Sequence, residues 1–168
     1  MAHSRTDVVR EALRVLDAHG IEGFSMRRIA GALDVQPSAL YHHVASKQEL
    51  LALMADDILR DVVVGADLAG TCQDLRAAML AVRDGAEVVA TASAFRLGAS
   101  AIEADIAARL GDRDAARTVL LFVFGHTQAT QLHQQAAAVG AIEDDPSLDA
   151  SFARGLEIIG AGVARTSA

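Results

Sequence analysis

The stretch 25-SMRRIAGALDVQPSALYHHVASKQELL-51 contains the signals that decide the fold of this chain. Ser25 predicts the start of a helix, because a serine hydroxyl accepts hydrogen bonds from the first backbone N–H groups of a helix. Residues 34–36 then read as a three-residue turn. Pro37 fits the first position of a following helix, where its missing N–H costs nothing. This second helix is short and is expected to end near Val44.

Helices are also predicted on both sides of this pair. A first helix is expected from about Thr6 to His19, where apolar residues recur at helical spacing. Ser46 and Glu49 form a capping-box pattern that starts a fourth helix. A helix, a tight turn and a short helix, with another helix behind them, make up the helix-turn-helix pattern.

The composition favours helices and a cytoplasmic location. Of the 168 residues, 52% are apolar, only 4% are aromatic and two are proline, which disfavours a sheet. The single cysteine, Cys72, cannot form an internal disulfide and fits a reducing compartment. The N-terminus MAHSRTDVV lacks the apolar core of a signal peptide. Residues 118–142 carry too many glutamines and histidines for a membrane span. We therefore expect a soluble, all-α protein.

The charge is unevenly distributed. The net charge of −7 disfavours nucleic-acid binding for the chain as a whole. Residues 1–50, however, hold six basic and six acidic residues, whereas residues 51–168 hold nine basic and sixteen acidic ones. A neutral N-terminal head on an acidic body would let one end approach DNA.

The segment resembles the DNA-binding head of the TetR family of bacterial repressors. The family's pattern is matched at positions Ser25, Arg27, Ile29, Ala30, Val35, Leu40, Tyr41, His43, Val44, Lys47 and Leu50. A departure is Asp34, where the family often has glycine; Asp tolerates left-handed backbone better than most residues.

The resemblance extends into the body. Arg83-Asp84-Gly85-Ala86, Gly125-His126 and the segment 152–159 look similar to landmarks of the tetracycline-repressor branch. The resemblance implies an all-helical homodimer whose interface is built from the helices at 115–139 and 148–164. We assign to that interface Val119, Val123, Phe152, Leu156, Ile159 and Val163. Gly155, Gly160 and Gly162 likewise suggest close helix–helix packing, between subunits.

The resemblance does not extend to the tetracycline–Mg²⁺ ligand of the tetracycline-repressor branch. In the tetracycline-repressor branch a histidine shortly after Arg-Asp-Gly coordinates a drug-chelated Mg²⁺. Here the matching position is Val89 or Val88, and neither side chain binds a metal. A tetracycline–Mg²⁺ effector is therefore not expected, and no cofactor or metal is assigned.

The Tyr41-His42-His43 cluster is interpreted as part of a DNA-binding surface. Adjacent residues on a helix diverge by about 100°, so His42 and His43 cannot chelate one ion. Small residues at the start of a recognition helix let it enter the major groove, and polar residues further along contact bases and phosphates. Packing of Tyr41 or His43 against the first helix is the structural alternative. The predicted DNA-binding residues are Arg27, Arg28, Gln36, Pro37, Ser38, Ala39, Tyr41, His42, His43 and Lys47.

An effector pocket is expected in the body, because polar residues interrupt an otherwise apolar helix at 115–139. Its predicted lining is Leu75, Met79, Val89, Phe95, Phe122, His126, Thr130 and Gln134. Hydrogen-bonded burial is the alternative for His126 and His133. No nucleophile elbow, P-loop or dinucleotide motif is present, so no catalytic residues are assigned and the protein is not expected to be an enzyme.

These observations predict a helix-turn-helix DNA-binding domain at residues 1–46 and a helical effector-binding and dimerisation domain at residues 47–168. The expected function is a one-component transcriptional regulator, a repressor that binds a palindromic operator as a homodimer and is released by a small-molecule effector. The alternatives are a DNA-binding regulator without an effector, and a metal-dependent helical enzyme using His126, His133 and Glu143 or Asp144.

Overall fold

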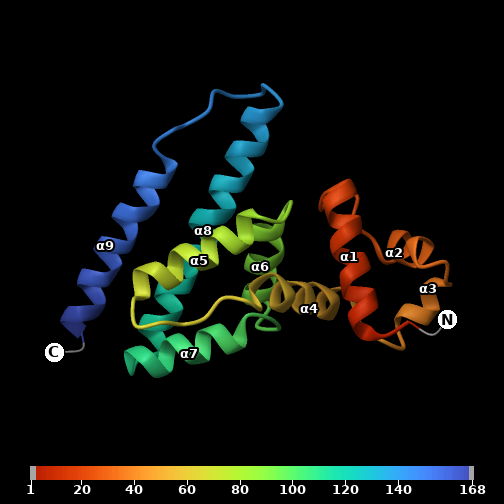
Figure 1. The fold of residues 1–168 in the computed structure, drawn as a ribbon, viewed down its shortest axis with the longest axis horizontal. Coiled ribbons are helices and arrows are strands. Elements are labelled where there is room, and N and C mark those ends of the chain that lie inside the picture. The colour runs from red at the N-terminus through yellow and green to blue at the C-terminus, as the bar shows by residue number, and fades with distance from the viewer. Residues whose placement is uncertain (1–2, 167–168) are drawn as a thin grey trace. The chain divides into compact units, whose positions relative to one another are not determined.

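A computed structural model describes residues 3–166, which form nine α-helices and no strand (Figure 1). The all-α prediction is confirmed. The helices are α1 Arg5–His19, α2 Met26–Ala32, α3 Pro37–Leu40, α4 Lys47–Leu59, α5 Leu68–Leu80, α6 Gly85–Ala94, α7 Ser100–Leu110, α8 Arg113–Ala138 and α9 Leu148–Thr166. None of the described helices is both long and apolar enough to cross a membrane.

The chain forms two compact units. The first contains the chain up to Asp61 together with Ala78–Ala99, and the second contains Val62–Ala77 and the chain from Ser100 onward. In the first unit, α1 packs on α2 and α4, α2 on α3, and α4 on α6. In the second, α8 packs on both α7 and α9. The compact unit that holds the head thus also includes α4 and α6, whereas the predicted domain boundary between residues 46 and 47 remains a prediction.

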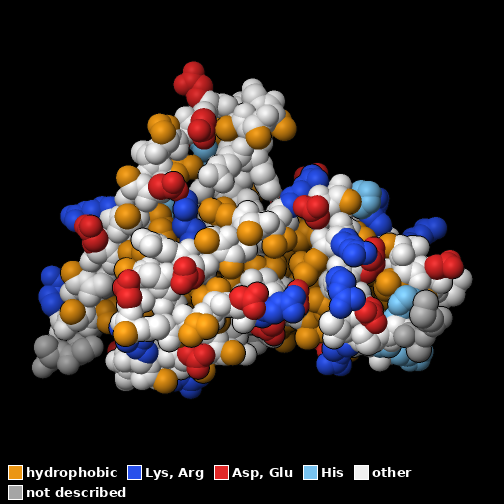
Figure 2. All heavy atoms as spheres, viewed as in Figure 1, with side chains coloured by type: hydrophobic (Ala, Val, Ile, Leu, Met, Phe, Trp, Pro, Cys, Tyr) orange, Lys and Arg blue, Asp and Glu red, His pale blue; other side chains and the backbone are white. Residues whose placement is uncertain are grey.

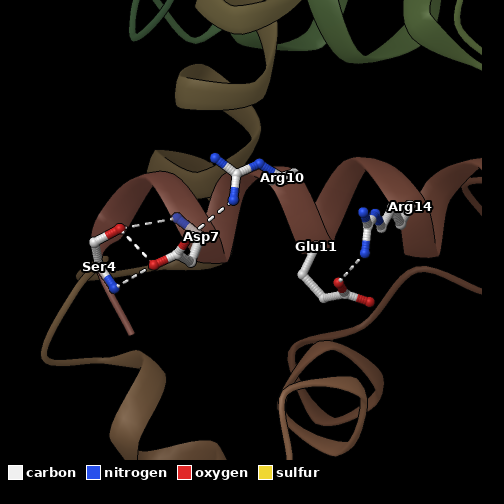
Figure 3. A network of polar contacts seen from close by, with 5 residues as sticks. All are labelled: Ser4, Asp7, Arg10, Glu11 and Arg14. Carbon is white, nitrogen blue, oxygen red and sulfur yellow. Dashed lines mark hydrogen bonds and ion pairs between the residues drawn. The ribbon is translucent and has the colours of Figure 1, made fainter. Parts of the chain in front are cut away.

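Helix α1 begins in a network of short-range polar contacts (Figure 3). The Ser4 hydroxyl accepts a hydrogen bond from the Asp7 N–H at 3.2 Å, and the Asp7 carboxylate accepts one from the Ser4 N–H at 2.9 Å. This is a capping box, which satisfies N–H groups left without helical partners. The hydrogen bonds from Ser4, followed by the charge of Arg10, lower the pKa of Asp7 to about 2.

The core of the head comes from the apolar positions that the sequence pattern predicts. Leu16 of α1, Ile29 of α2, Leu40 of α3, and Leu50 and Met54 of α4 are almost completely buried. Burying a side chain of this size contributes about 1.5–3 kcal/mol. The four helices therefore hold one another in place through a shared apolar centre.

The turn between α2 and α3 is formed by left-handed backbone at Asp34, with φ 54°. The Ser25 hydroxyl caps α2 as predicted, accepting from the Arg28 N–H at 3.3 Å. The Val35 N–H donates to the Ala30 carbonyl at 2.9 Å and closes the turn. Helix α3 ends at Leu40, four residues before the predicted end near Val44, because the chain tightens into a turn over residues 41–43.

Replacing Asp34 should change stability in opposite directions according to the new residue. Left-handed backbone costs an L-residue roughly 1–2 kcal/mol and glycine little. Asp34→Gly is expected to raise the free energy of unfolding by about 1 kcal/mol, as measured by urea denaturation. Asp34→Ala, which lacks the local hydrogen bonding of Asp, serves as the matched control and should lower it. Equal stability of the two variants would contradict the role of this turn.

Candidate nucleic-acid interface

The helix-turn-helix presents most of the predicted DNA-binding side chains to solvent. Tyr41 is 53% exposed. Ala39, His43 and Lys47 are half-buried. The remaining predicted residues are exposed: Arg27, Arg28, Gln36, Pro37, Ser38 and His42. The surface thus combines the start of α2 with α3 and the turn that follows it.

The charges of α1 are largely paired with one another. Arg10 lies 2.9 Å from Asp7, and Arg14 lies 3.6 Å from Glu11 (Figure 3). Figure 2 shows basic and acidic side chains side by side over this helix. Arg5 is similarly placed 3.8 Å from Glu49. These pairs reduce the positive potential that α1 contributes.

Arg27 and Arg28 differ from the arginines of α1. Within residues 3–166, no carboxylate lies within 4.0 Å of either guanidinium. Both side chains are exposed at the start of α2. The positive charge available to an external anion in the head is therefore concentrated at this helix end, next to α3.

Lys47 has an internal role that the sequence did not reveal. Its Nζ donates to the Phe24 carbonyl at 3.3 Å and lies 5.3 Å from the centroid of the Phe24 ring. A cation above an aromatic face is attracted by about 0.5–1 kcal/mol at an accessible site. The side chain thus ties the start of α4 to the segment before α2, while it remains half-buried.

His3 and Arg5, at the start of α1, contact the segments on either side of α3. His3 Nε2 lies 3.1 Å from the Leu33 carbonyl, and Arg5 Nε donates to the His43 carbonyl at 2.9 Å. His3, His42 and His43 border a largely apolar hollow of about 250 Å³. These contacts span 30 and 38 residues, so no local pattern predicts them.

The end of α1 is joined to the start of α6. The Asp84 carboxylate accepts a hydrogen bond from the Ile21 N–H at 2.7 Å, and Arg83 donates to the Asp17 carbonyl at 3.0 Å. Asp84 has left-handed backbone with φ 55°. At Gly20, which has φ 66°, an added Cβ would lie 3.0 Å from the Asp84 carboxylate. The Arg-Asp-Gly motif therefore connects the helix-turn-helix to the remainder of its compact unit.

The eight predicted effector residues are divided between the two units. Met79, Val89 and Phe95 belong to the first, and the others belong to the second. Leu75, Met79, Val89 and Thr130 are fully buried, Phe122 and His126 are half-buried, and Phe95 and Gln134 are exposed.

Part of this set forms a cluster in the second unit. The His126 ring lies 5.5 Å from the Phe122 ring and 5.3 Å from the Phe152 ring. Thr130 Oγ1 is 3.3 Å from His126 Nδ1. The sequence did not indicate Arg76, whose guanidinium lies 5.0 Å from the Phe152 ring centroid. Burial lowers the pKa of His126, and the Arg76 charge lowers it further.

The predicted dimer residues lie on inward faces of α8 and α9. Val119, Val123 and Phe152 are buried by their own chain, and Leu156, Ile159 and Val163 are half-buried. Gly155 serves this intrachain packing, because an added Cβ would come within 2.2 Å of the Phe122 ring. A Cβ at Gly160 or Gly162 would meet no atom within 4 Å.

No group of three or more His, Cys, Asp or Glu side chains that could hold a metal ion occurs in the described part of the chain. The combination of His126, His133 and Glu143 or Asp144, which a metal-dependent enzyme would need, is thus not assembled there.

Comparisons with known proteins agree with this geometry. Residues 8–54 match the family model of bacterial regulatory proteins, tetR family. The chain is 31% identical to the class A tetracycline repressor protein from transposon 1721 of Escherichia coli, covering 94% of this chain and 89% of that protein. The crystal structure of Mycobacterium smegmatis BioQ superimposes with a TM-score of 0.88 at 38% identity, covering 98% of this chain and 99% of that one.

A second BioQ structure contains the protein's natural double-stranded DNA operator. It superimposes with a TM-score of 0.83 at 35% identity and covers 98% of this chain and 99% of that one. The chain belongs to the TetR family of bacterial transcriptional regulators. The family consists of regulators and not enzymes, as the sequence predicted.

Removing the Asp84 carboxylate should destabilise the first unit. Asp84→Ala leaves the Ile21 N–H without its partner and places alanine in left-handed backbone, so the free energy of unfolding should fall by about 2 kcal/mol. Chemical denaturation followed by circular dichroism measures this change. The control is Asp74→Ala on the exposed side of α5, which should have little effect. Similar free energies of unfolding for the two variants would contradict the importance of the hydrogen bond between Asp84 and Ile21.

Proposed function

We propose that the protein is a homodimeric repressor that binds a palindromic DNA operator and is released by a small-molecule effector. The DNA-binding part rests on the exposed surface of α2, the turn and α3, in which Arg27 and Arg28 form no ion pair with any residue among 3–166. The chain is similar to BioQ, whose structure has been determined with a DNA operator, and this similarity supports double-stranded DNA as the partner of this chain as well.

In this proposal α3 enters the major groove. Pro37, Ser38 and Ala39 are short enough for the helix start to approach base edges, and Ser38 offers a hydroxyl. Tyr41 and His42 extend from the same segment toward phosphates or bases. Arg27 and Arg28 form bidentate hydrogen bonds to phosphate or guanine, which a guanidinium supports better than a lysine does.

We propose a modified role for Lys47, because its Nζ is bonded within the head. A lysine bonded to the Phe24 carbonyl contributes to the shape of the head as well as to its charge. We therefore assign non-specific electrostatic attraction mainly to the two arginines of α2. The His43 carbonyl accepts the Arg5 hydrogen bond, which holds the backbone of His43, and its half-buried side chain remains a proposed DNA contact.

Homodimerisation is proposed through the outward faces of α8 and α9. Leu121 and Leu132 on α8 are 59% and 52% exposed, and Ile158 on α9 is 59% exposed. Gly125 lies between the two leucines at helical spacing, and nothing within 4 Å would contact a Cβ there. An apolar stripe with a small residue at its centre suits close packing of helices from a second copy. In this arrangement the six interface residues predicted from sequence pack on the inward faces of α8 and α9 and hold the outward faces in position.

A dimer places two recognition helices on DNA. Two-fold symmetry of the protein requires a two-fold symmetric operator, with half-sites about one helical turn apart. An effector that binds one arrangement of the heads better than the other shifts the population toward it, and that differential affinity is the only source of release.

Selection of binding sites from a random duplex pool tests the function. The expected product is a palindromic site, bound by the wild-type protein with steep salt dependence. Arg27→Ala combined with Arg28→Ala removes two arginines from each subunit and should reduce the slope of log affinity against log salt by up to about four for the dimer, since each phosphate contact contributes roughly one. Base preference should also relax at one position if either arginine reads guanine.

Arg60→Ala is the matched control for this experiment. Arg60 is exposed at the end of α4 and paired with Asp57, outside the proposed DNA and dimer surfaces, so its removal should leave DNA affinity unchanged. An unchanged salt slope in the double variant, or the absence of an enriched site for the wild type, would overturn the proposed DNA surface.

The dimer proposal predicts a change in molecular mass. Leu121→Glu combined with Ile158→Glu puts charges into the proposed interface, and desolvating them costs several kcal/mol per ion. Analytical ultracentrifugation should show a dimer for the wild type and a monomer for the variant. Val63→Glu, at a position that is 77% exposed outside the interface, should remain dimeric. A monomeric wild type or a dimeric double variant would disprove this interface.

A further inference from the structure

The second unit contains a cavity that does not coincide with the effector residues predicted from sequence. Its volume is about 290 Å³. It is lined by residues 66–69 and Cys72 at the start of α5, by Arg109 near the end of α7, by Val119 of α8, and by Leu156, Ile159 and Gly160 of α9. Small-molecule pockets typically measure about 300–1,000 Å³, so this cavity suits a small ligand.

The interior of the cavity is apolar and uncharged. Cys72 and Val119 are 0% and 1% exposed and form its deep side. Leu68, Leu156 and Ile159 are half-buried and form the walls. Burial raises the pKa of Cys72 to about 11, so the thiol stays neutral at pH 7. The cavity therefore favours a hydrocarbon or aromatic group and offers no thiolate nucleophile.

A guanidinium stands at the mouth. Arg109 is exposed and donates from Nη2 to the Ala66 carbonyl, which holds the side chain beside the opening. Within the described residues, no carboxylate lies within 4.0 Å of it. A guanidinium has five N–H donors, so one bond to a carbonyl leaves donors for an anion.

Asp67 is the other charged residue in the lining, and it is engaged with its own helix. Its Oδ1 accepts from the Ala69 N–H at 3.0 Å, and its carbonyl accepts from the Thr71 N–H at 3.1 Å. It thus caps the first turn of α5. The charge at the mouth that is fixed and still has open donors is Arg109.

From this combination we infer that the cavity binds a small amphipathic carboxylate, with its apolar part against Cys72 and Val119 and its carboxylate against Arg109. The inference gives the proposed effector a chemical class, and to that extent it rests on the proposed function. On α9, Leu156 and Gly160 lie about 160° around the helix from Ile158, and Ile159 lies about 100° from it. Dimerisation through the outward faces therefore leaves the cavity lining unchanged.

Octanoate and octanamide are the probes that test this site, because they share an apolar tail and differ in charge. Isothermal titration calorimetry on the full chain should show saturable binding of octanoate and binding of octanamide that is weaker by about tenfold or more, since a charge-assisted hydrogen bond is lost. Arg109→Gln should weaken octanoate by about the same factor and leave octanamide unchanged. Arg113→Gln, an exposed arginine four residues away, should change neither.

A second variant tests the cavity itself. Cys72 is 0% exposed and lies on the deep side of the cavity, so Cys72→Met fills the cavity from α5. Binding of both probes should be lost, while Ala153→Leu on the exposed side of α9 retains it. Val119→Phe, which fills the cavity from α8, should abolish binding of both probes in the same way and replaces Cys72→Met if that variant does not fold.

Several results would overturn the inference: no saturable binding of octanoate to the wild type, equal binding of octanamide, or unchanged octanoate binding in Arg109→Gln or in the filled variants. DNA binding is measured on the same preparations. Wild-type protein that selects an operator and does not bind octanoate refutes the cavity inference alone. Wild-type protein that binds octanoate and selects no DNA site refutes the proposed function alone.

Discussion

The left-handed backbone at Asp34 is the constraint on which the DNA-binding surface depends. Helix α3 has only four residues, far fewer than an isolated helix needs for stability in water. Its position is therefore imposed from outside, by the turn at Asp34 on one side and by buried Leu40 and Val44 on the other. A change in this turn would move the recognition surface as a whole, because α3 has no independent means of keeping its orientation.

The same head shows how an acidic protein can present a surface for DNA. The net charge of −7 describes the average field, whereas binding depends on the charges within about 10 Å of the phosphates. Pairing along α1 cancels part of the positive charge, and Lys47 is partly used to hold Phe24. What remains available is concentrated at the start of α2. Local pairing therefore decides where the head is attractive to an anion, and the overall charge does not.

Local signals in the sequence predicted the head well. The caps at Ser25 and Ser46 and the helix start at Pro37 depend on neighbouring residues, and the structure places them as expected. One detail differs, since the Glu49 carboxylate reaches the Ala45 N–H and not the N–H of Ser46. The contacts of His3, Arg5 and Lys47 could not be predicted, because each joins segments more than twenty residues apart.

In the body, periodicity located the helices but did not specify what each face contacts. The stripe Phe152, Leu156, Ile159 and Val163 has the spacing of any buried helix face, whether the partner is the same chain or a second copy. Phe152 is 3% exposed and its ring stacks 5.6 Å from that of Phe122, so the partner at this level is α8 of the same chain. The glycines distinguish packing within the chain from packing against a second copy better than the apolar residues do.

At Gly155 an added Cβ would clash with the Phe122 ring, so intrachain packing requires a glycine there, whereas a Cβ at Gly125 would meet nothing within 4 Å in the described chain. Helix α9 therefore serves two purposes with its two sides. Its inward side packs on α8 and closes a cavity, and its outward side carries Ile158 toward solvent or a second copy. Because these sides are opposed, substitutions on one need not disturb the other. Substitutions on α9 would then alter the proposed ligand binding and the proposed assembly separately, although a single helix contributes to both.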